Sequence, residues 1–369
     1  MKTSIFICTI AFSAACLLAG CEKENTEISD GGIRFTANGS NTFSVCEVPT
    51  KVSLYNNITD FTNSGASFAV LANDQDYSAT VFGEKIVTKS GDYYEPAEAY
   101  YWYGDYINVY AVAPYISGSR PSTISNLKVI TDPTGKDSAD YKNYLSFDKD
   151  YLSFDYQTLN SGIRVDASSL NDIMVGFNQN SHECSGSSKI VNINFYHVLS
   201  GMRFKAGNTL IGKTIKSISL IDFEAVGKFY VNISDSKVEE IKFKGLLLGG
   251  KTATDTNRYI YDNKYGVHGV TIASDDVGNE IGGAGNIIFL PPASLNTDNA
   301  PYFSRLRVII EEDGKDLVYS KLFPTIELQE KLKPSYIYDI TIDIDDYKYT
   351  RTSTTDNPLR LSVTKTPME

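Results

Sequence analysis

The chain has 369 residues, with 34 Lys and Arg against 45 Asp and Glu, so its formal net charge is −11 at pH 7. A surface this acidic repels nucleic acids and anionic lipid headgroups, which excludes both as natural partners. The length is too great for one ordinary β-sandwich and suits two domains. Tyr and Phe are abundant, with 25 and 18 residues, and such aromatic side chains favour strands.

Residues 1–20 have the features of an export signal. Lys2 supplies the positive start, residues 5–18 are apolar, and the run ends in Leu18-Ala19-Gly20-Cys21. This run matches a bacterial lipobox, which predicts cleavage before Cys21 and attachment of lipid to the thiol and amine of Cys21. An ordinary secretory signal or a short membrane anchor is the alternative, although the apolar run is too short to span a bilayer comfortably.

Five cysteines occur in the chain, but few of them remain for a disulfide. Cys8 and Cys16 leave with the export signal and Cys21 carries lipid, so Cys46 and Cys184 remain. A disulfide between them and two buried free thiols are both consistent with the sequence.

Alternating apolar residues predict strands along most of the chain. Residues 336–344 place Tyr and Ile on one face and Asp and Thr on the other, and residues 107–111, 191–199 and 229–233 have the same period. Residues 305–322 predict a hairpin, because Asp313-Gly314 accepts the positive φ angles of a tight turn. No segment has a sustained helical period. The sequence therefore predicts an all-β protein built from antiparallel sandwiches.

A polar stretch that contains Gly and Ser at residues 178–189 suggests a domain boundary. We expect a signal peptide at 1–20, an N-terminal β-sandwich at 21–185, a C-terminal β-sandwich at 186–347 and a tail at 348–369. In the tail, Leu359, Leu361 and Val363 alternate with polar residues after a polar linker. An extended tail of this kind presents one apolar edge and predicts a donor strand for another molecule, whereas a frayed polar terminus is the alternative.

Two segments match the phosphate-binding string of nucleotide-binding loops, at residues 207–214 and 245–252. That chemistry requires a helix directly after the loop, because the helix N-terminus helps to hold the phosphates. A strand pattern follows the first string and a polar run follows the second. Both segments are therefore predicted to be β-turns.

The remaining motifs do not assemble a catalytic or metal centre. His182, His197 and His268 lack metal-ligand spacing, and His197 lies on the apolar face of its strand, as a buried structural histidine would. The Ser-x-x-Lys string at residues 146–149 lacks its companion motifs, and the acidic stretch at 275–280 lacks the ligand order of a calcium loop. We expect no enzyme activity, no cofactor and no metal.

The densest aromatic cluster lies at residues 100–106 and contains the single Trp. If Tyr101, Trp102 and Tyr103 are exposed, they can stack on a sugar or a host protein. Buried packing at the edge of a β-domain is the favoured interpretation, because a strand pattern follows immediately.

Several segments together resemble the fimbrillin family of Bacteroidetes, the lipoprotein precursors of type V pili. They are, in order, GIRFTA at 32–37, YYW at 100–102, VYAVAP at 109–114, NFYHVLSGMRF at 194–204, IIFLPP at 287–292 and KPSYIYDI at 333–340. Glu22-Lys23-Glu24 after the lipidated cysteine is also similar to the surface-export signal of Bacteroidetes lipoproteins.

The resemblance implies two transthyretin-like β-sandwich domains in tandem and a structural role in a surface fibre. It also implies assembly by strand exchange, in which a protease frees an N-terminal strand and a donor strand from another subunit fills the groove. The protease of this family often cuts after Arg or Lys, which makes Arg34 and Lys51 the candidate cleavage sites. Lys51 stands where many relatives carry Thr-Arg, so the chain departs from the family pattern there.

The leading hypothesis is a subunit of a surface fimbria that supports adhesion, anchored at first in the outer membrane through the lipid on Cys21. Its partners are then other copies or related pilus subunits, with a host protein or glycan as the adhesion target. The alternative is a monomeric, lipid-anchored surface protein that binds glycans or host ligands.

Overall fold

The computed structural model describes residues 32–39, 66–74, 80–100, 107–115, 124–131, 145–146, 150–156, 164–166, 172–181, 190–221, 227–234, 237–245, 260–262, 269–282, 287–292, 304–322, 332–345 and 357–368. Within these residues the protein is all β, with three sheets and no α-helix, which confirms the all-β class predicted from alternation. The sheets are not purely antiparallel as expected, since β1 (Arg34–Gly39) pairs with β10 (Ile190–His197) and β11 (Ser200–Ala206) with β20 (Tyr336–Ile344) in parallel. Two short 3-10 turns, Asn208–Leu210 and Ser274–Asp276, interrupt the strands. None of the described residues belongs to a helix long and apolar enough to cross a membrane.

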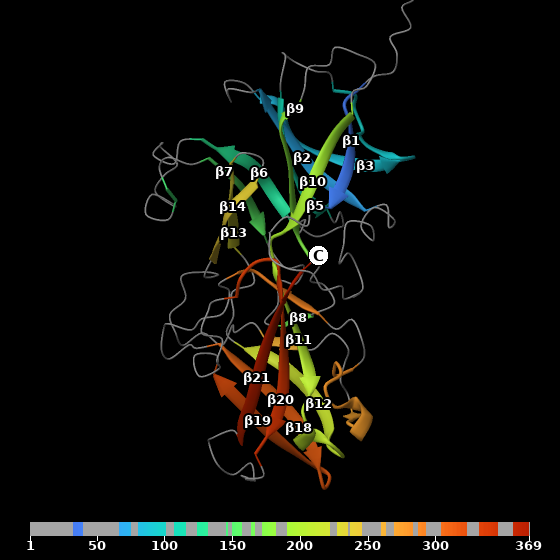
Figure 1. The fold of residues 1–369 in the computed structure, drawn as a ribbon, viewed down its shortest axis with the longest axis vertical. Helices are drawn as coiled ribbons and strands as arrows, with labels where there is room; N and C mark the ends of the chain where they lie inside the picture. The colour runs from blue at the N-terminus through green and yellow to red at the C-terminus, as the bar shows by residue number, and fades with distance from the viewer. Residues whose placement is uncertain are drawn as a thin grey trace, which may run out of the picture.

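The first sheet closes into a ring in the upper half of Figure 1. Its strands, in spatial order, are β1 (Arg34–Gly39), β10 (Ile190–His197), β9 (Met174–Ser181), β5 (Ile107–Tyr115), β2 (Ser67–Asp74), β3 (Thr80–Ser90) and β4 (Tyr93–Pro96). β1 closes the ring, because it runs parallel to β10 on one side and meets β4 on the other.

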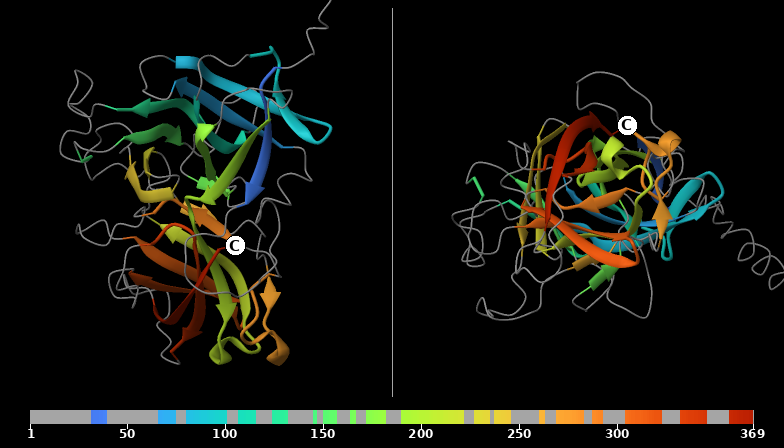
Figure 2. Two further views of the ribbon diagram at one scale, coloured as in Figure 1. Left: turned by 45° about the horizontal axis from the view of Figure 1, so that its top comes forward. Right: turned by 90° about the horizontal axis from the view of Figure 1, so that it is seen from below.

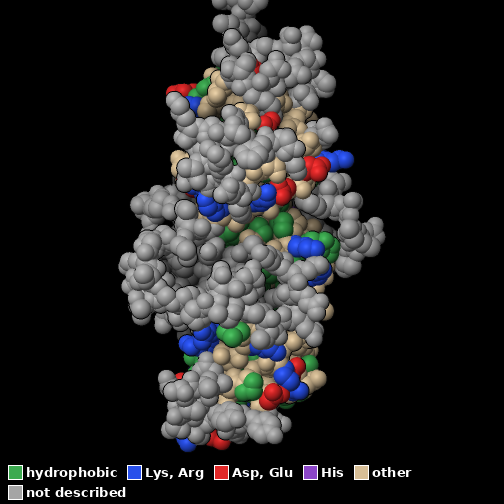
Figure 3. Space-filling view, turned by 90° about the vertical axis from the view of Figure 1, so that its left-hand side faces the viewer, with side chains coloured by type: hydrophobic (Ala, Val, Ile, Leu, Met, Phe, Trp, Pro, Cys, Tyr) green, Lys and Arg blue, Asp and Glu red, His purple; other side chains and the backbone are tan. Residues whose placement is uncertain are grey.

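A second sheet of four strands lies beside the ring. Its order is β14 (Lys237–Gly245), β13 (Gly227–Ser234), β7 (Tyr151–Tyr156) and β6 (Ile124–Ile130). The side of the molecule that carries this sheet shows hydrophobic side chains at mid-height beneath a row of Lys and Arg (Figure 3). The pairing of β13 with β7 joins segments that are far apart in the sequence.

The third sheet occupies the lower half of Figure 1. Its strands, in order, are β17 (Ile288–Leu290), β11 (Ser200–Ala206), β20 (Tyr336–Ile344), β21 (Asn357–Pro367), β19 (Lys315–Leu322), β18 (Arg305–Glu312), β12 (Thr214–Ile221), β15 (Ile260–Asp262) and β8 (Arg164–Asp166), and β16 (Val270–Thr271) also pairs with β12. Side chains from β11, β12, β18 and β20 meet in one core, so the sheet curls around its own apolar face (Figure 2).

Alternation correctly predicted the faces of the best-patterned strands. Tyr338, Ile340, Ile342 and Ile344 of β20 point into the core of the third sheet, and Tyr336 packs against it. The predicted hairpin is also confirmed, since β18 and β19 pair in register and Asp313 and Gly314 have φ angles of 52° and 71°. Burial of alternate aliphatic side chains is the main driving force for these pairings.

The strand β5 separates two cores. Its residues Ile107, Val109 and Ala111 face the interior of the ring, whereas Tyr110 and Val112 face a second core. This second core also contains the inner face of the four-stranded sheet and residues Ile287, Phe289 and Ile337 of the third sheet. A continuous apolar interior therefore connects all three sheets.

The chain passes from the ring to the third sheet between β10 and β11, at Val198 and Leu199. The boundary expected after residue 185 falls before β10, a strand of the ring, and no single cut of the chain separates the sheets, because β13 pairs back with β7 and β8 pairs with the later β15. The expected tail is also not separate, because β21 lies inside the third sheet.

Candidate functional site

The first strand is held in the ring mainly by one neighbour and by its buried side chains. β1 pairs with β10 in parallel over six residues, but it pairs with β4 only at Phe35 opposite Tyr94. The side chains of Ile33 and Phe35 are 1% and 0% exposed, and Phe35 makes edge contacts with Phe68 and Phe82. Removing β1 would therefore open an apolar groove bordered by unpaired strand edges.

Arg34, one of the two candidate cleavage sites, lies within β1. Its Nε is 2.9 Å from Glu95 Oε1, and its guanidinium lies 5.7 Å from the centre of the Tyr93 ring. The preceding residue is also fixed, since Ile33 N–H donates a hydrogen bond to Tyr100 O at 2.7 Å. Proteases prefer exposed loops, so cleavage at Arg34 would first require β1 to detach. Lys51, the other candidate, lies outside the described residues.

The candidate donor residues lie in β21, which is docked against its own molecule. Leu359, Leu361 and Val363 stand opposite Ile344, Ile342 and Ile340 of β20. Leu359 is 2% exposed, and the other two pack partly buried against the same core. β21 therefore forms a regular strand rather than the frayed terminus that the sequence also allowed, but its pairing with another molecule stays a prediction.

The first and last strands present apolar side chains with the same spacing. β1 and the residue before it place Ile33, Phe35 and Ala37 toward the ring interior at every second position. β21 places Leu359, Leu361 and Val363 toward its core at every second position. Because the side-chain period of a strand is two, either set could occupy the same kind of groove.

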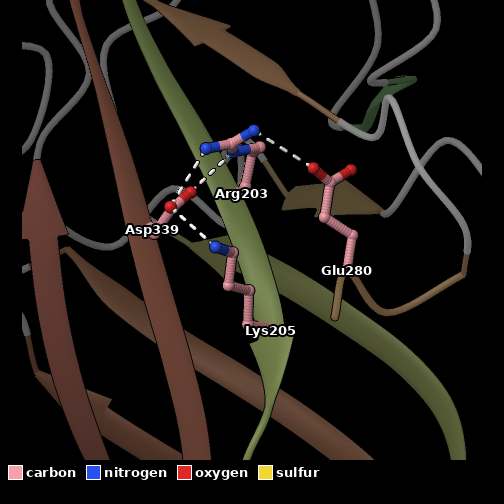
Figure 4. Close-up of polar contacts among 4 residues, drawn as sticks. All are labelled: Arg203, Lys205, Glu280 and Asp339. Carbon is pink, nitrogen blue, oxygen red and sulfur yellow. Dashed lines mark hydrogen bonds and ion pairs between the residues drawn. The ribbon is translucent and has the colours of Figure 1, made fainter. Parts of the chain in front are cut away.

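A cluster of four charged side chains was missed by sequence reasoning. Arg203 of β11 lies between Asp339 of β20 and Glu280, and Lys205 also points to Asp339 (Figure 4). Arg203 Nε and Nη2 lie 2.5 and 3.0 Å from the two oxygens of Asp339, and Lys205 Nζ lies 2.8 Å from Oδ2. The positive and negative charges balance, so the cluster acts as a structural tie between β11, β20 and the segment around Glu280.

His197 is buried, as its position on the apolar face predicts, with 9% of the residue exposed. The Nδ1 atom of His197 contacts Oδ2 of Asp172, which is fully buried. The sequence spacing of these two residues gave no indication that they are partners. Asp172 Oδ1 has no hydrogen-bond partner among the described residues. This carboxylate also helps to raise the pKa of the buried Tyr156 phenol, for which burial is the larger cause.

The first phosphate-loop string forms a turn, as predicted. A 3-10 turn and β12 follow Gly207, and the carboxylate of Asp343 occupies the turn by accepting hydrogen bonds from Thr209 N at 3.1 Å and Thr209 Oγ1 at 2.8 Å. Lys213 forms an ion pair with Glu312. The hydrogen-bond donors of Thr209 and the ammonium group of Lys213, which a phosphate would need, are thus already bound to Asp343 and Glu312. The second string lies almost wholly outside the described residues.

The described part of the chain contains no group of three or more His, Cys, Asp or Glu side chains that could hold a metal ion. In the acidic stretch, the Asp276 carboxylate accepts a hydrogen bond from Ala273 N at 2.8 Å, and Asn279 Nδ2 donates to Asp275 O at 2.8 Å. Both hydrogen bonds join residues of the same loop, so they stabilise the loop itself.

Several predicted site residues lie outside the part of the chain that the structure describes. They are the lipidation residue Cys21, the aromatic residues Tyr101, Trp102 and Tyr103, and the two remaining cysteines Cys46 and Cys184. The expectations for these residues stay predictions.

The sequence matches no protein-family model and no curated protein. Solved structures match along most of the chain. A fimbrial protein from Bacteroides vulgatus is 10% identical, with 92% of this chain and 99% of that chain covered and a TM-score of 0.48. A fimbrial assembly protein from Parabacteroides distasonis is 10% identical, with 90% and 98% covered and a TM-score of 0.40. The tip fimbrial protein Mfa3 from Porphyromonas gingivalis is 11% identical, with 82% and 94% covered and a TM-score of 0.36.

Proposed function

We propose that this protein is a structural subunit of a cell-surface fimbria, made as a lipoprotein precursor and assembled by proteolysis and strand exchange. The observation that carries the proposal is the matched spacing of apolar side chains in β1 and β21, at opposite ends of the chain. One strand fills a groove in the precursor, and the other has the pattern needed to refill that groove from a neighbouring subunit.

Cleavage at Lys51 would separate β1 from β2 and leave β1 itself uncut. Lys51 falls between β1 and β2 in the sequence, whereas Arg34 lies within β1 and forms an ion pair with Glu95 of β4. After the cut, β1 is held by non-covalent contacts: its pairing with β10 and β4, the ion pair of Arg34 with Glu95, and the burial of Ile33 and Phe35. Burial of a Phe side chain contributes roughly 1.5–3 kcal/mol, which an incoming strand with its own apolar side chains can replace.

The donor strand in this mechanism is β21. Among the strands that the structure describes, β21 has its only long pairing with β20, because it meets β19 at Asn357 and Pro358 alone. Most of its other edge has no partner strand among the described residues. A strand attached along one edge detaches more readily than one bonded on both sides, which suits a segment that leaves its own subunit to pair elsewhere.

The remaining features follow from this role. Lipid on Cys21 would hold the precursor in the outer membrane, and Glu22-Lys23-Glu24 would direct it to the cell surface. We assign the ring and the four-stranded sheet to one transthyretin-like sandwich domain, and the third sheet to the other. The protein acts through assembly and adhesion, with other pilus subunits as partners, and not as an enzyme.

The test is to express the protein in a cell lacking its own copy, shear the surface and run unboiled gels. Wild-type protein should give a ladder of high-mass polymers and a subunit whose sequence starts after Lys51. Lys51→Ala should remain an uncut monomer, whereas Lys51→Arg should still be cut by an Arg-directed protease. Wild-type protein that stays monomeric on the surface would contradict the proposal and favour a lipid-anchored protein that binds glycans or host ligands.

A further inference from the structure

The crossover between the ring and the third sheet is bonded to the start of β20. Ser335 N–H donates to Leu199 O at 2.8 Å, and Ser335 Oγ donates to His197 O at 2.6 Å. On its other side, the crossover is tied to the ring, because Val198 N–H donates to Ile173 O at 3.0 Å. Ser335 thus fixes the segment in which the chain changes sheets.

Ser335 is also bonded to the end of the tail. Its carbonyl accepts a hydrogen bond from Met368 N–H at 2.7 Å, so all three of its polar groups are engaged. The residue is 7% exposed and has a φ angle of 62°, in the left-handed region that side chains other than Gly rarely adopt. Such a conformation persists only where surrounding contacts hold it, and here those contacts come from the crossover and the tail together.

The side chain of Met368 adds an apolar contact at the same place. It packs against the core that joins the ring, the four-stranded sheet and the third sheet. A Cβ atom added at Gly201 would lie 3.1 Å from Met368 Cε, 3.0 Å from Ile287 Cγ2 and 3.1 Å from Ile337 Cγ1. Gly201 therefore leaves the space that Met368 fills, and Figure 1 shows that the C-terminus ends at mid-height beside the junction of the two halves.

We infer that Ser335 and Met368 form a latch that couples the docking of β21 to the order of the crossover. When the tail leaves, the Ser335 carbonyl loses its donor and the junction core loses Met368, so the crossover loosens. Coupling of this kind is reciprocal, and a loosened crossover must equally weaken the docking of the tail. If β21 is the donor strand of the proposed function, its release also frees the two halves of the subunit to change their relative orientation.

Hydrogen exchange measured by mass spectrometry on the purified monomer tests the latch. Deletion of residues 368–369 keeps every β20–β21 pair but removes the Met368 contacts. We expect exchange to rise about five-fold in peptides that cover residues 196–203, the effect of one lost hydrogen bond. Ser335→Ala should raise exchange by a similar factor in residues 357–367. The hydroxyl that this substitution removes donates to His197 O in the crossover and not to the tail.

Two further variants keep the test decisive. Met368→Ala removes only the side-chain contact and should give a smaller change of the same kind. Ser362→Ala, an exposed serine on β21, is the matched control and should leave both regions unchanged. The coupling would be overturned if the deletion speeded hydrogen exchange in the tail but not in the crossover. It would also be overturned if Ser335→Ala speeded exchange in the crossover but not in the tail. The result is independent of polymer formation, so failure of the latch and failure of the proposed function are separate outcomes.

Discussion

Asp339 receives two hydrogen bonds from Arg203, from Nε at 2.5 Å and from Nη2 at 3.0 Å, at a point where β11 and β20 run side by side. The two residues are only 8% and 5% exposed. A buried bidentate pair of this kind depends on both partners, because either charge alone would be left in a poorly solvated environment.

Arg203→Ala should therefore lower the free energy of unfolding by roughly 3 kcal/mol, with Lys205 left as the remaining partner of Asp339. Chemical denaturation at neutral pH measures the change. Lys216→Ala is the control, since Lys216 makes ion pairs with Glu311 and Asp316 at an exposed site and should have little effect. Equal effects of the two substitutions would show that the cluster contributes no more than a surface pair.

Tyr156→Phe should raise the free energy of unfolding by roughly 1 kcal/mol at neutral pH. The Tyr156 hydroxyl is buried without a hydrogen-bond partner among the described residues, and removing such a group removes its desolvation cost. Tyr151→Phe is the matched control and should be destabilising, because Tyr151 OH donates to Glu240 Oε2 at 3.1 Å. A loss of stability in Tyr156→Phe would mean that its hydroxyl has a partner, such as an ordered water.

Stability should fall as the pH rises above about 10. Burial raises the pKa of Tyr94 to about 12 and also raises that of Tyr156, whereas both groups ionise near 10 in the unfolded chain. The unfolded state loses these protons first, so the stabilisation is complete below pH 10 and declines up to pH 12. Denaturation midpoints between pH 8 and 11 measure the slope, which Tyr156→Phe should reduce. An unchanged slope would contradict the assignment to Tyr156.

Gly207→Ala should destabilise the protein by about 1–3 kcal/mol, because the added Cβ would lie 2.3 Å from Cγ of Asp343 and displace the carboxylate from the turn. Gly83→Ala has open space at its Cβ position and should be neutral or slightly stabilising.

Calorimetry with ATP and magnesium should show no binding to the wild-type protein. Micromolar binding that disappears in Lys213→Ala would show that the segment is a nucleotide site after all.

Deletion of residues 357–369 should leave an exported monomer that cannot polymerise. The monomer should also be less stable than the full chain, since β20 loses its partner strand and the core loses Leu359. A synthetic peptide of residues 357–369 should raise its melting temperature by refilling the vacant position. Polymers of normal length from the truncated protein would remove the tail from the mechanism.

Cys21→Ala should abolish lipid attachment and mislocalise the precursor, because the thiol is the attachment atom of the lipobox. Metabolic labelling with a fatty-acid analogue checks this directly. Label that is undiminished in the variant would show that the N-terminal segment is an ordinary signal or anchor.

The sequence predicted what is local in this fold. The alternation in residues 336–344 and the Asp313-Gly314 turn depend on neighbours in the chain, and both were confirmed. Pairings between distant segments, such as β13 with β7, leave no comparable local signal. The same holds for side chains: alternation put Asp339 on the polar face of its strand, but only the fold brings Arg203 beside it and buries both. The one sign of this pair in the sequence was the position of Arg203, a charged residue between the apolar residues Met202 and Phe204.

The interleaving of the sheets determines when the protein can fold. β13, which pairs with β14 on one edge, pairs on its other edge with the much earlier β7, and β8 pairs with the later β15, so neither half of the molecule is a continuous stretch of sequence. A nascent chain ending at residue 185 still lacks β10, β13 and β14, and with them one wall of the ring and half of the four-stranded sheet. Native structure must therefore await the synthesis of most of the chain.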